Sequence, residues 1–113
     1  MPPTVFSLFP RNDGLERELI STVLTGRGFR LEHIVSNAAA SPDGFWYDQD
    51  RNEWVVLIQG AATLEFPDGP LDLRAGDCLL IEAHQRHRVS FTSQDAVWIA
   101  LHFDADSSVE PDS

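Results

Sequence analysis

Apolar and polar residues alternate along much of the chain with a period of two, which is typical of β-strands. The alternation is clear from residue 29, where one face holds Phe29, Leu31, His33 and Val35 and the other holds Arg30, Glu32 and Ile34. Residues 54–58 form a continuous apolar run that stops at Gly60. Such a run predicts a strand that is covered on both faces.

Further strands are predicted where short apolar stretches lie between turn-forming residues. They are residues 61–66, 71–73, 78–81, 87–91 and 97–103. The sequence Pro-Asp-Gly-Pro at residues 67–70 marks a turn, and so does Ala-Gly-Asp at residues 75–77. Many short strands with close turns and no helices between them predict an all-β fold, an antiparallel sandwich or barrel.

The first 28 residues have a different pattern. Residues 4–9 predict a short edge strand that ends at Pro10. Asp13, followed three residues later by Glu16, is typical of a helix start. Apolar residues then recur at helical spacing up to Gly26. We therefore expect a short amphipathic N-terminal helix.

Composition limits the function more than the fold. The 113 residues suffice for one domain with its own core, and the formal net charge is −10. An acidic chain with no lysine lacks the positive patch that nucleic-acid binding needs, and it cannot form a lysine Schiff base. No apolar run is long enough to span a membrane. The single cysteine, Cys78, and the absence of a signal peptide favour the cytoplasm.

Glu53 precedes the apolar run and needs a partner, because an unpaired buried carboxylate is costly. The best candidates lie in the sequence His-Gln-Arg-His-Arg at residues 84–88. His87 shares a face with Val89 and Phe91, so it is predicted to point into the protein. Glu53 and His87 then either hold a metal together or form a hydrogen-bonded couple.

Residues 29–103 resemble a cupin, a jelly-roll β-barrel with two sequence motifs. In the first motif two histidines precede a Glu, and a Gly follows after six intervening residues. Glu53 and Gly60 match that Glu and Gly. The histidine positions hold Tyr47 and Gln49 on the shorter spacing, or Trp46 and Asp48 on the longer. Gly76 and His87 match the second motif, in which Glu82, His84 and Phe91 replace the usual Pro, Gly and Asn.

The resemblance implies a metal centre of three imidazoles and one carboxylate, suited to Fe, Mn, Ni, Cu or Zn. Here Glu53 and His87 would be ligands, His84 would add a nitrogen, and Asp48 or Gln49 an oxygen. Tyr47 would act as an acid or donate a hydrogen bond to a substrate, unless it only packs at the barrel rim. His33 is expected to point into the barrel, where a lone histidine is more often a core residue than a metal ligand. The sequence does not decide whether the strand face that holds His102 lines the barrel.

Three parts of the chain are therefore predicted: an N-terminal strand and helix (1–28), a cupin barrel (29–103) and a disordered acidic tail (104–113). The expected function is a small metal-binding cupin that holds a small organic ligand, with oxygenase, isomerase or lyase chemistry if it is an enzyme. The alternative is a metal-free binding or regulatory module without catalysis. A homodimer is expected, because Trp54, Val56 and Ile58 need cover on the strand face opposite Val55 and Leu57.

Overall fold

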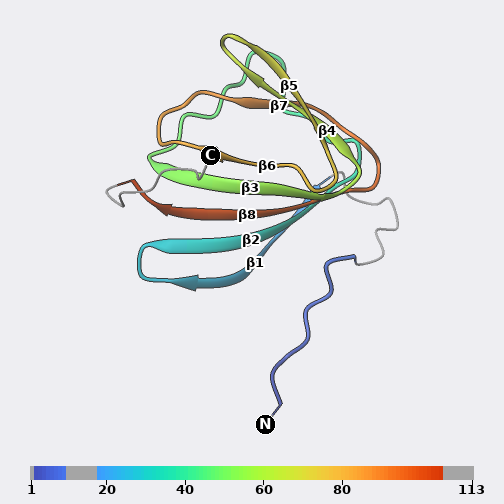
Figure 1. The fold of residues 1–113 in the computed structure, drawn as a ribbon, viewed down its shortest axis with the longest axis vertical. Helices are drawn as coiled ribbons and strands as arrows, with labels where there is room; N and C mark the ends of the chain where they lie inside the picture. The colour runs from blue at the N-terminus through green and yellow to red at the C-terminus, as the bar shows by residue number, and fades with distance from the viewer. Residues whose placement is uncertain (1, 10–17, 106–113) are drawn as a thin grey trace.

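The protein is built from two antiparallel β-sheets (Figure 1), as seen in a computed structural model that describes residues 2–9 and 18–105. The larger sheet has five strands in the order β1-β2-β8-β3-β6. Their bounds are β1 Glu18–Gly26, β2 Phe29–Ser36, β3 Arg51–Gln59, β6 Cys78–Ile81 and β8 Ala96–Asp104. The smaller sheet has the order β5-β4-β7, with β4 Ala61–Phe66, β5 Gly69–Arg74 and β7 Arg88–Thr92.

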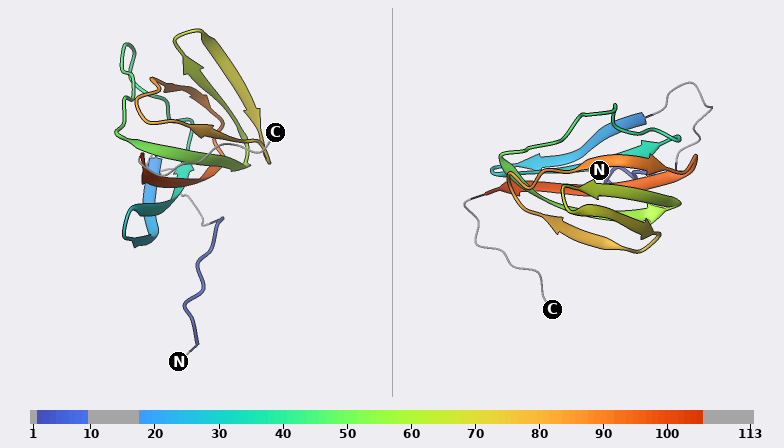
Figure 2. Two further views of the ribbon diagram at one scale, coloured as in Figure 1. Left: turned by 60° about the vertical axis from the view of Figure 1, so that its left-hand side comes forward. Right: turned by 90° about the horizontal axis from the view of Figure 1, so that it is seen from above.

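The two sheets face each other and enclose the interior, as the side and top views in Figure 2 show. This arrangement confirms the predicted all-β jelly-roll barrel. The strands predicted from Phe29 onward also form, with ends that differ by up to three residues. In the described residues no helix is present that is long and apolar enough to cross a membrane.

The hairpin between β3 and β4 depends on Gly60. Its φ of +87° lies in the left-handed region that side chains disfavour. A Cβ at this position would lie 2.5 Å from the Ser93 Oγ and 2.9 Å from the Ala96 Cα. Glycine is therefore required both for the turn and for the close approach of the chain before β8.

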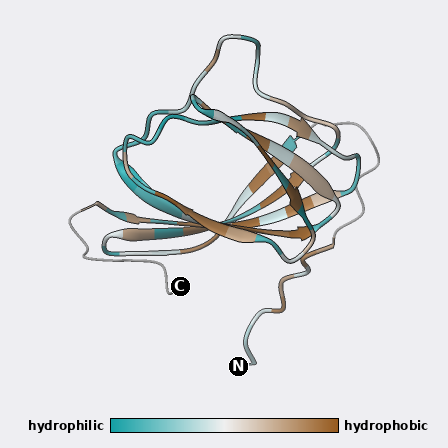
Figure 3. Ribbon diagram, turned by 45° about the horizontal axis from the view of Figure 1, so that its top comes forward, coloured by the Kyte–Doolittle hydropathy of each residue, from teal (hydrophilic) through white to brown (hydrophobic). Residues whose placement is uncertain are grey.

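The hydrophobic core lies between the two sheets. Figure 3 shows apolar residues along the facing strands and polar residues in the connecting loops. The buried core residues are Val55, Leu57, Ala62, Leu64, Leu73, Ile81, Ala96, Trp98 and Ala100. Burial of this apolar surface is the main stabilising contribution to the barrel.

The predicted N-terminal helix is wrong over Glu18–Gly26, which forms strand β1 beside β2. A β-bulge between Thr22 and Leu24 adds one residue to β1. This extra residue shifts the alternation by one position, so that the apolar pairs before and after it are four residues apart. The bulge thus produced a spacing that resembles a helix. The predicted helix start at Asp13 and Glu16 lies outside the described residues.

Residues 4–9, predicted as an edge strand, pair with no strand. Within this segment Phe6 and Leu8 instead contact His33 on the outer face of the larger sheet. The His33 Nε2–H donates to the Leu8 carbonyl oxygen at 2.7 Å, and the Phe6 ring meets the His33 ring edge-on at 5.1 Å. The prediction that His33 enters the barrel is therefore wrong, because this imidazole points outward and is covered by the N-terminal segment.

The barrel also begins earlier than predicted. Strand β1 is hydrogen-bonded to β2 in the same sheet, so part of the segment 1–28 belongs to the barrel. At the other end β8 continues to Asp104. Of the predicted acidic tail, residues 106–113 lie outside the described residues, and its disorder stays a prediction.

Candidate functional site

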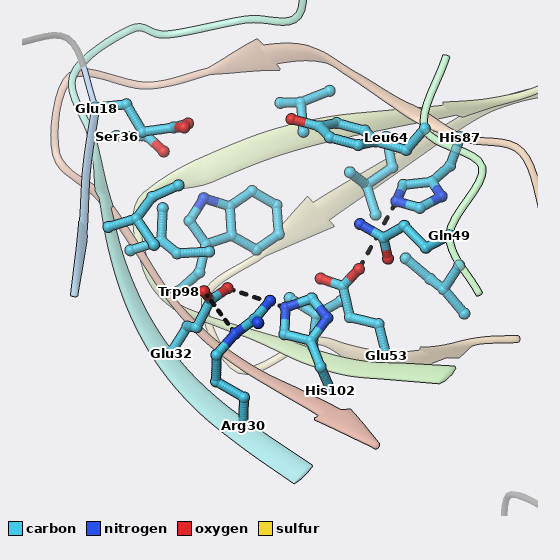
Figure 4. Close-up of a pocket in the computed structure, with 16 residues that line it drawn as sticks. Glu18, Arg30, Glu32, Ser36, Gln49, Glu53, Leu64, His87, Trp98 and His102 are labelled. Carbon is cyan, nitrogen blue, oxygen red and sulfur yellow. Dashed lines mark hydrogen bonds and ion pairs between the residues drawn. The ribbon is translucent and has the colours of Figure 1, made fainter. Parts of the chain in front are cut away.

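A cavity of about 290 Å³ opens into the barrel between the two sheets (Figure 4). It is lined by Glu18, Ile20, Arg30, Glu32, Ile34, Ser36, Tyr47, Gln49, Glu53, Val55, Leu64, Ile81, His87, Val89, Trp98 and His102. Apolar side chains form much of the wall, and a few polar groups converge in it. This combination is typical of a small-molecule binding site.

Glu53 and His87 face each other across the cavity from opposite sheets. Glu53 lies on β3, and His87 precedes β7 and is held by an isolated β-bridge to Tyr47. The Glu53 Oε1 and the His87 Nε2 are 3.8 Å apart, and their side chains are only 12% and 6% exposed. This distance is too long for a direct hydrogen bond, which leaves both atoms open to a ligand.

The tautomer of His87 follows from its other ring nitrogen. Nδ1 lies 3.0 Å from the Gln85 carbonyl oxygen, which can only accept a hydrogen bond. Nδ1 therefore carries the hydrogen, and a neutral His87 presents the lone pair of Nε2 to Glu53 and the cavity.

Burial changes the proton affinity of both groups. It raises the pKa of Glu53 to about 7, with a smaller contribution from the charge of Glu32. Burial lowers the pKa of His87, and the hydrogen bond to Gln85 offsets part of this effect. Near neutral pH the carboxyl is thus close to half-protonated beside a neutral imidazole, a state suited to proton transfer.

A second carboxylate–imidazole pair lies beside the first. The His102 Nε2–H donates to the Glu32 Oε1 at 2.9 Å, and the Arg30 Nε–H donates to the Glu32 Oε2 at 3.1 Å. Burial lowers the pKa of His102, and Glu32 partly offsets this effect. Glu32 is held on both oxygens, so it is a fixed negative charge near Glu53.

Sequence reasoning missed Glu32 and Arg30 and left the direction of His102 open. On β2 the face of Glu32 and Ile34 lines the cavity, whereas the more apolar face of Leu31 and His33 points outward. The usual rule that the apolar face points inward failed here because the interior holds a polar cavity. The available signal was the pair of charged residues, Arg30 and Glu32, on one face of a central strand.

Tyr47 lines the cavity beside His87. The two rings stack with centroids 5.3 Å apart at an interplanar angle of 24°. Burial raises the pKa of the Tyr47 hydroxyl, the charges of Glu18 and Glu53 raise it further, and a hydrogen bond with Ser41 opposes them. The hydroxyl therefore stays protonated near neutral pH, and Tyr47 can donate a hydrogen bond into the cavity.

Asp48 and His84 do not lie with the other predicted ligands. The Asp48 Oδ1 and the His84 Nδ1 are 2.7 Å apart, and their side chains are 53% and 69% exposed. Neither residue lines the cavity. The structure thus brings Glu53 together with His87, and Asp48 together with His84, at separate places.

The residues of the cavity do not reproduce a centre of three imidazoles and one carboxylate. Within residues 2–9 and 18–105 there is no group of three or more His, Cys, Asp or Glu placed to hold a metal ion. Of the motif positions that line the cavity, Tyr47 and Gln49 stand where imidazoles would be needed. The buried Oε1 atoms of Gln49 and Glu53 nevertheless have no hydrogen-bond partner in the part of the chain that the structure describes. Oxygen atoms in this state require a ligand, a water or an ion.

Comparison with known proteins defines the class. The sequence model of the cupin domain family matches residues 30–102, and the chain belongs to this family. Its barrel is also similar to a solved structure from Ralstonia eutropha JMP134 that is named as a putative mannose-6-phosphate isomerase. The two share 40% sequence identity with a TM-score of 0.85, over 91% of this chain and 100% of the other.

More distant structures share the fold alone. KdgF from Halomonas sp. has 17% identity and a TM-score of 0.68, over 81% of this chain and 84% of the other. A cupin superfamily protein from Desulfitobacterium hafniense DCB-2 has 14% identity and a TM-score of 0.67, over 84% and 82% of the two chains. No curated protein matches the sequence.

Proposed function

We propose that this cupin binds a small polar organic molecule in its cavity, and that Glu53 and His87 exchange a proton with it. The observation that carries the proposal is the pair itself. An acid with a pKa of about 7 faces the free Nε2 of His87 at 3.8 Å inside a ligand-sized cavity. A group that titrates near the working pH is an effective general acid or base.

Glu53, His87 and Tyr47 have different roles in this proposal. Ionised Glu53 removes a proton from the ligand, for example from a carbon next to a carbonyl group. His87 Nε2 accepts or returns a proton from the opposite side, and the Tyr47 hydroxyl donates a hydrogen bond to a ligand oxygen. If the proton is returned to a neighbouring carbon of the ligand, the reaction is an isomerisation. If the deprotonated ligand instead expels a leaving group, the reaction is that of a lyase. The isomerase name of the Ralstonia relative agrees with proton transfer.

The test begins with a thermal-shift screen of small hydroxy-carbonyl compounds, since a bound ligand stabilises the folded protein. Ile20 lines the cavity and is 52% exposed, so Ile20→Trp narrows the opening at little cost to folding. We expect this variant to lose ligand stabilisation. For each compound that binds, NMR in D2O measures the exchange of its carbon-bound hydrogens.

We expect Glu53→Gln to slow this exchange at least about a hundredfold, which is typical for loss of a general base. Asp48→Asn removes a carboxylate from the surface pair and serves as the matched control, with unchanged exchange. If the wild-type protein binds compounds but exchanges none of their hydrogens, the protein is a binding module without catalysis. A protein that binds none of them would overturn the proposal.

A metal site is the second candidate function, favoured by the two unpartnered oxygens of Gln49 and Glu53. These oxygens and His87 Nε2 would hold Fe, Zn, Mn, Ni or Cu as a reduced ligand set. Metal analysis after reconstitution tests this candidate, with Glu53→Ala and His87→Ala as variants that should lose the ion. Asp48 and His84 lie outside the cavity, so the variants Asp48→Ala and His84→Ala should retain the metal ion. Absence of stoichiometric metal in the wild type would contradict this candidate.

The partner that we propose for the barrel surface is a second copy of the chain. One apolar row crosses all five strands of the larger sheet on its outer face, through the paired residues Leu24, Leu31, Leu101, Trp54 and Leu80. Leu24 is 50% and Trp54 38% exposed in the single chain. Light scattering should give a dimer mass at micromolar concentration, and Trp54→Glu should give a monomer. A monomeric wild type would contradict the proposal.

Two further expectations stay predictions. The acidic composition disfavours nucleic acid as a partner, and the single cysteine favours a cytoplasmic location.

A further inference from the structure

The charges that line the cavity are unequal. Three carboxylates, those of Glu18, Glu32 and Glu53, face a single guanidinium, that of Arg30. This guanidinium is engaged with Glu32, at 3.1 Å from Nε to Oε2. The two imidazoles of the cavity add no fixed positive charge, since burial lowers the pKa of each. The cavity therefore carries a net negative charge.

The carboxylates have different surroundings. Glu32 accepts hydrogen bonds from His102 and Arg30, and Glu53 faces His87. The Glu18 carboxylate has no hydrogen bond or ion pair with any residue of the described ranges 2–9 and 18–105, and burial raises its pKa. Its charge still reaches into the cavity, because it raises the pKa of the Tyr47 hydroxyl. Among the described residues, Glu18 is thus the cavity carboxylate that no other protein group engages.

Aromatic rings lie near Glu18. In Figure 4 Glu18 and Ser36 lie on one side of the cavity, Gln49 and His87 lie on the other, and the Trp98 ring lies between them. Trp98 and Tyr47 both line the cavity, and Trp98 is 4% exposed. A carboxylate together with the face of an indole is a favourable environment for an organic ammonium group.

We infer that the molecule taken by this cavity carries a small organic cation, with its ammonium group between the Glu18 carboxylate and the Trp98 ring. This inference rests on the proposed function, since it names the ligand class of the same cavity. A phosphate group fits poorly, because it would meet three carboxylates and only one guanidinium that is already paired. With the ammonium group bound at Glu18, the other end of the ligand lies near Glu53 and His87, where the proposed proton exchange takes place.

Four probes test the charge preference by isothermal titration calorimetry at low salt. Choline is compared with its neutral carbon analogue 3,3-dimethyl-1-butanol, and mannose 6-phosphate is compared with mannose. We expect choline to bind about tenfold more tightly than the neutral analogue, from an ion pair and a cation–π contact. We expect the phosphate to bind no more tightly than mannose.

Two isosteric variants locate the effect. Glu18→Gln should remove most of the preference for choline over the neutral analogue. Glu82→Gln removes an equal charge from an exposed residue that does not line the cavity, and it should keep the preference. Tighter binding of mannose 6-phosphate than of mannose, or a preference that Glu18→Gln leaves intact, would overturn the inference.

The cavity-narrowing variant separates this inference from the proposed function. If the neutral probes bind, if Ile20→Trp abolishes their binding, and if choline binds no better, the cation inference fails and the proposed function stands. If neither these probes nor any compound of the thermal-shift screen shows binding that Ile20→Trp abolishes, both fail.

Discussion

Two of the histidine–carboxylate pairs in this barrel, one on the surface and one in the cavity, differ in almost every physical respect. The pair of His84 and Asp48 is close, at 2.7 Å, but its side chains are 69% and 53% exposed. The pair of His87 and Glu53 is wider, at 3.8 Å, but its side chains are 6% and 12% exposed. Burial raises the pKa of Glu53 to about 7 and lowers the pKa of His87.

The difference shows that burial, and not the separation of the two groups, gives such a pair its chemistry. Water solvates the exposed pair and screens the attraction between its two groups. At the buried pair the charged forms are penalised, and the two side chains remain open to a third group. The contrast between the two pairs can be measured in several ways.

The largest effect concerns stability and pH. The folded-state pKa of Glu53, about 7, lies above its ordinary value of 4.5, so the folded protein binds this proton more tightly than the unfolded chain. The penalty for ionising Glu53 is absent below pH 4.5, grows up to about pH 7 and is constant above it. It should reach about 3 kcal/mol of unfolding free energy.

Urea unfolding of the wild type and Glu53→Gln between pH 4.5 and pH 8.5 checks this prediction, with Asp48→Asn as the surface control. The difference between wild type and Glu53→Gln isolates the carboxyl, because His87 and His102 contribute to both proteins. Their lowered pKa values predict a separate loss of stability as the pH falls below the ordinary histidine value of 6.5. A difference that does not vary with pH would contradict the assignment to Glu53.

The next effect compares the two imidazoles by the same substitution. His87→Asn should lower the unfolding free energy by about 2–3 kcal/mol, because it removes a buried ring that stacks on Tyr47 and donates to Gln85. His84→Asn should change it by less than about 0.5 kcal/mol. Asparagine tolerates the positive φ of 64° at His84, so the substitution adds no backbone strain. Equal losses in the two variants would show that burial does not distinguish the pairs.

The sequence alone predicted most of the barrel and part of the cavity. Strands with plain alternation, such as β2 and β8, were predicted correctly, and so was the turn at Gly60. Strand β1 was not, because its bulge changes the period that the prediction depends on. A bulge is fixed by the pairing of two strands, which a single pattern does not contain.

The cavity was predicted only where a motif marked it. Glu53, His87 and Tyr47 were named from the sequence, and all three line the cavity. Glu18 and Glu32 were not predicted as site residues, because they lie on strands outside both motifs. Hydrophobicity also misled the prediction at β2, where the more apolar face points outward and is partly covered by residues 2–9.

A smaller effect tests whether the second buried pair influences the first. The charge of Glu32 contributes to the raised pKa of Glu53, although less than burial does. Glu32→Gln should therefore lower the pKa of Glu53, while Glu82→Gln, at an exposed residue, should leave it unchanged. NMR titration of the Glu53 side-chain carbon gives the value in each variant. An unchanged or higher pKa in Glu32→Gln would mean that burial alone sets the proton affinity.

The smallest effect is the coupling within the exposed pair. A double-mutant cycle with Asp48→Asn and His84→Asn should give a coupling energy below about 1 kcal/mol, as is usual for exposed ion pairs. Salt at 1 M should reduce this coupling further, since the Debye length is then only about 3 Å. The same cycle on Glu53→Gln and His87→Asn should depend much less on salt, because the protein shields both groups from the solvent. A surface coupling that survives high salt would show that His84 and Asp48 are held by more than their charges, and the contrast between the two pairs would then no longer rest on burial.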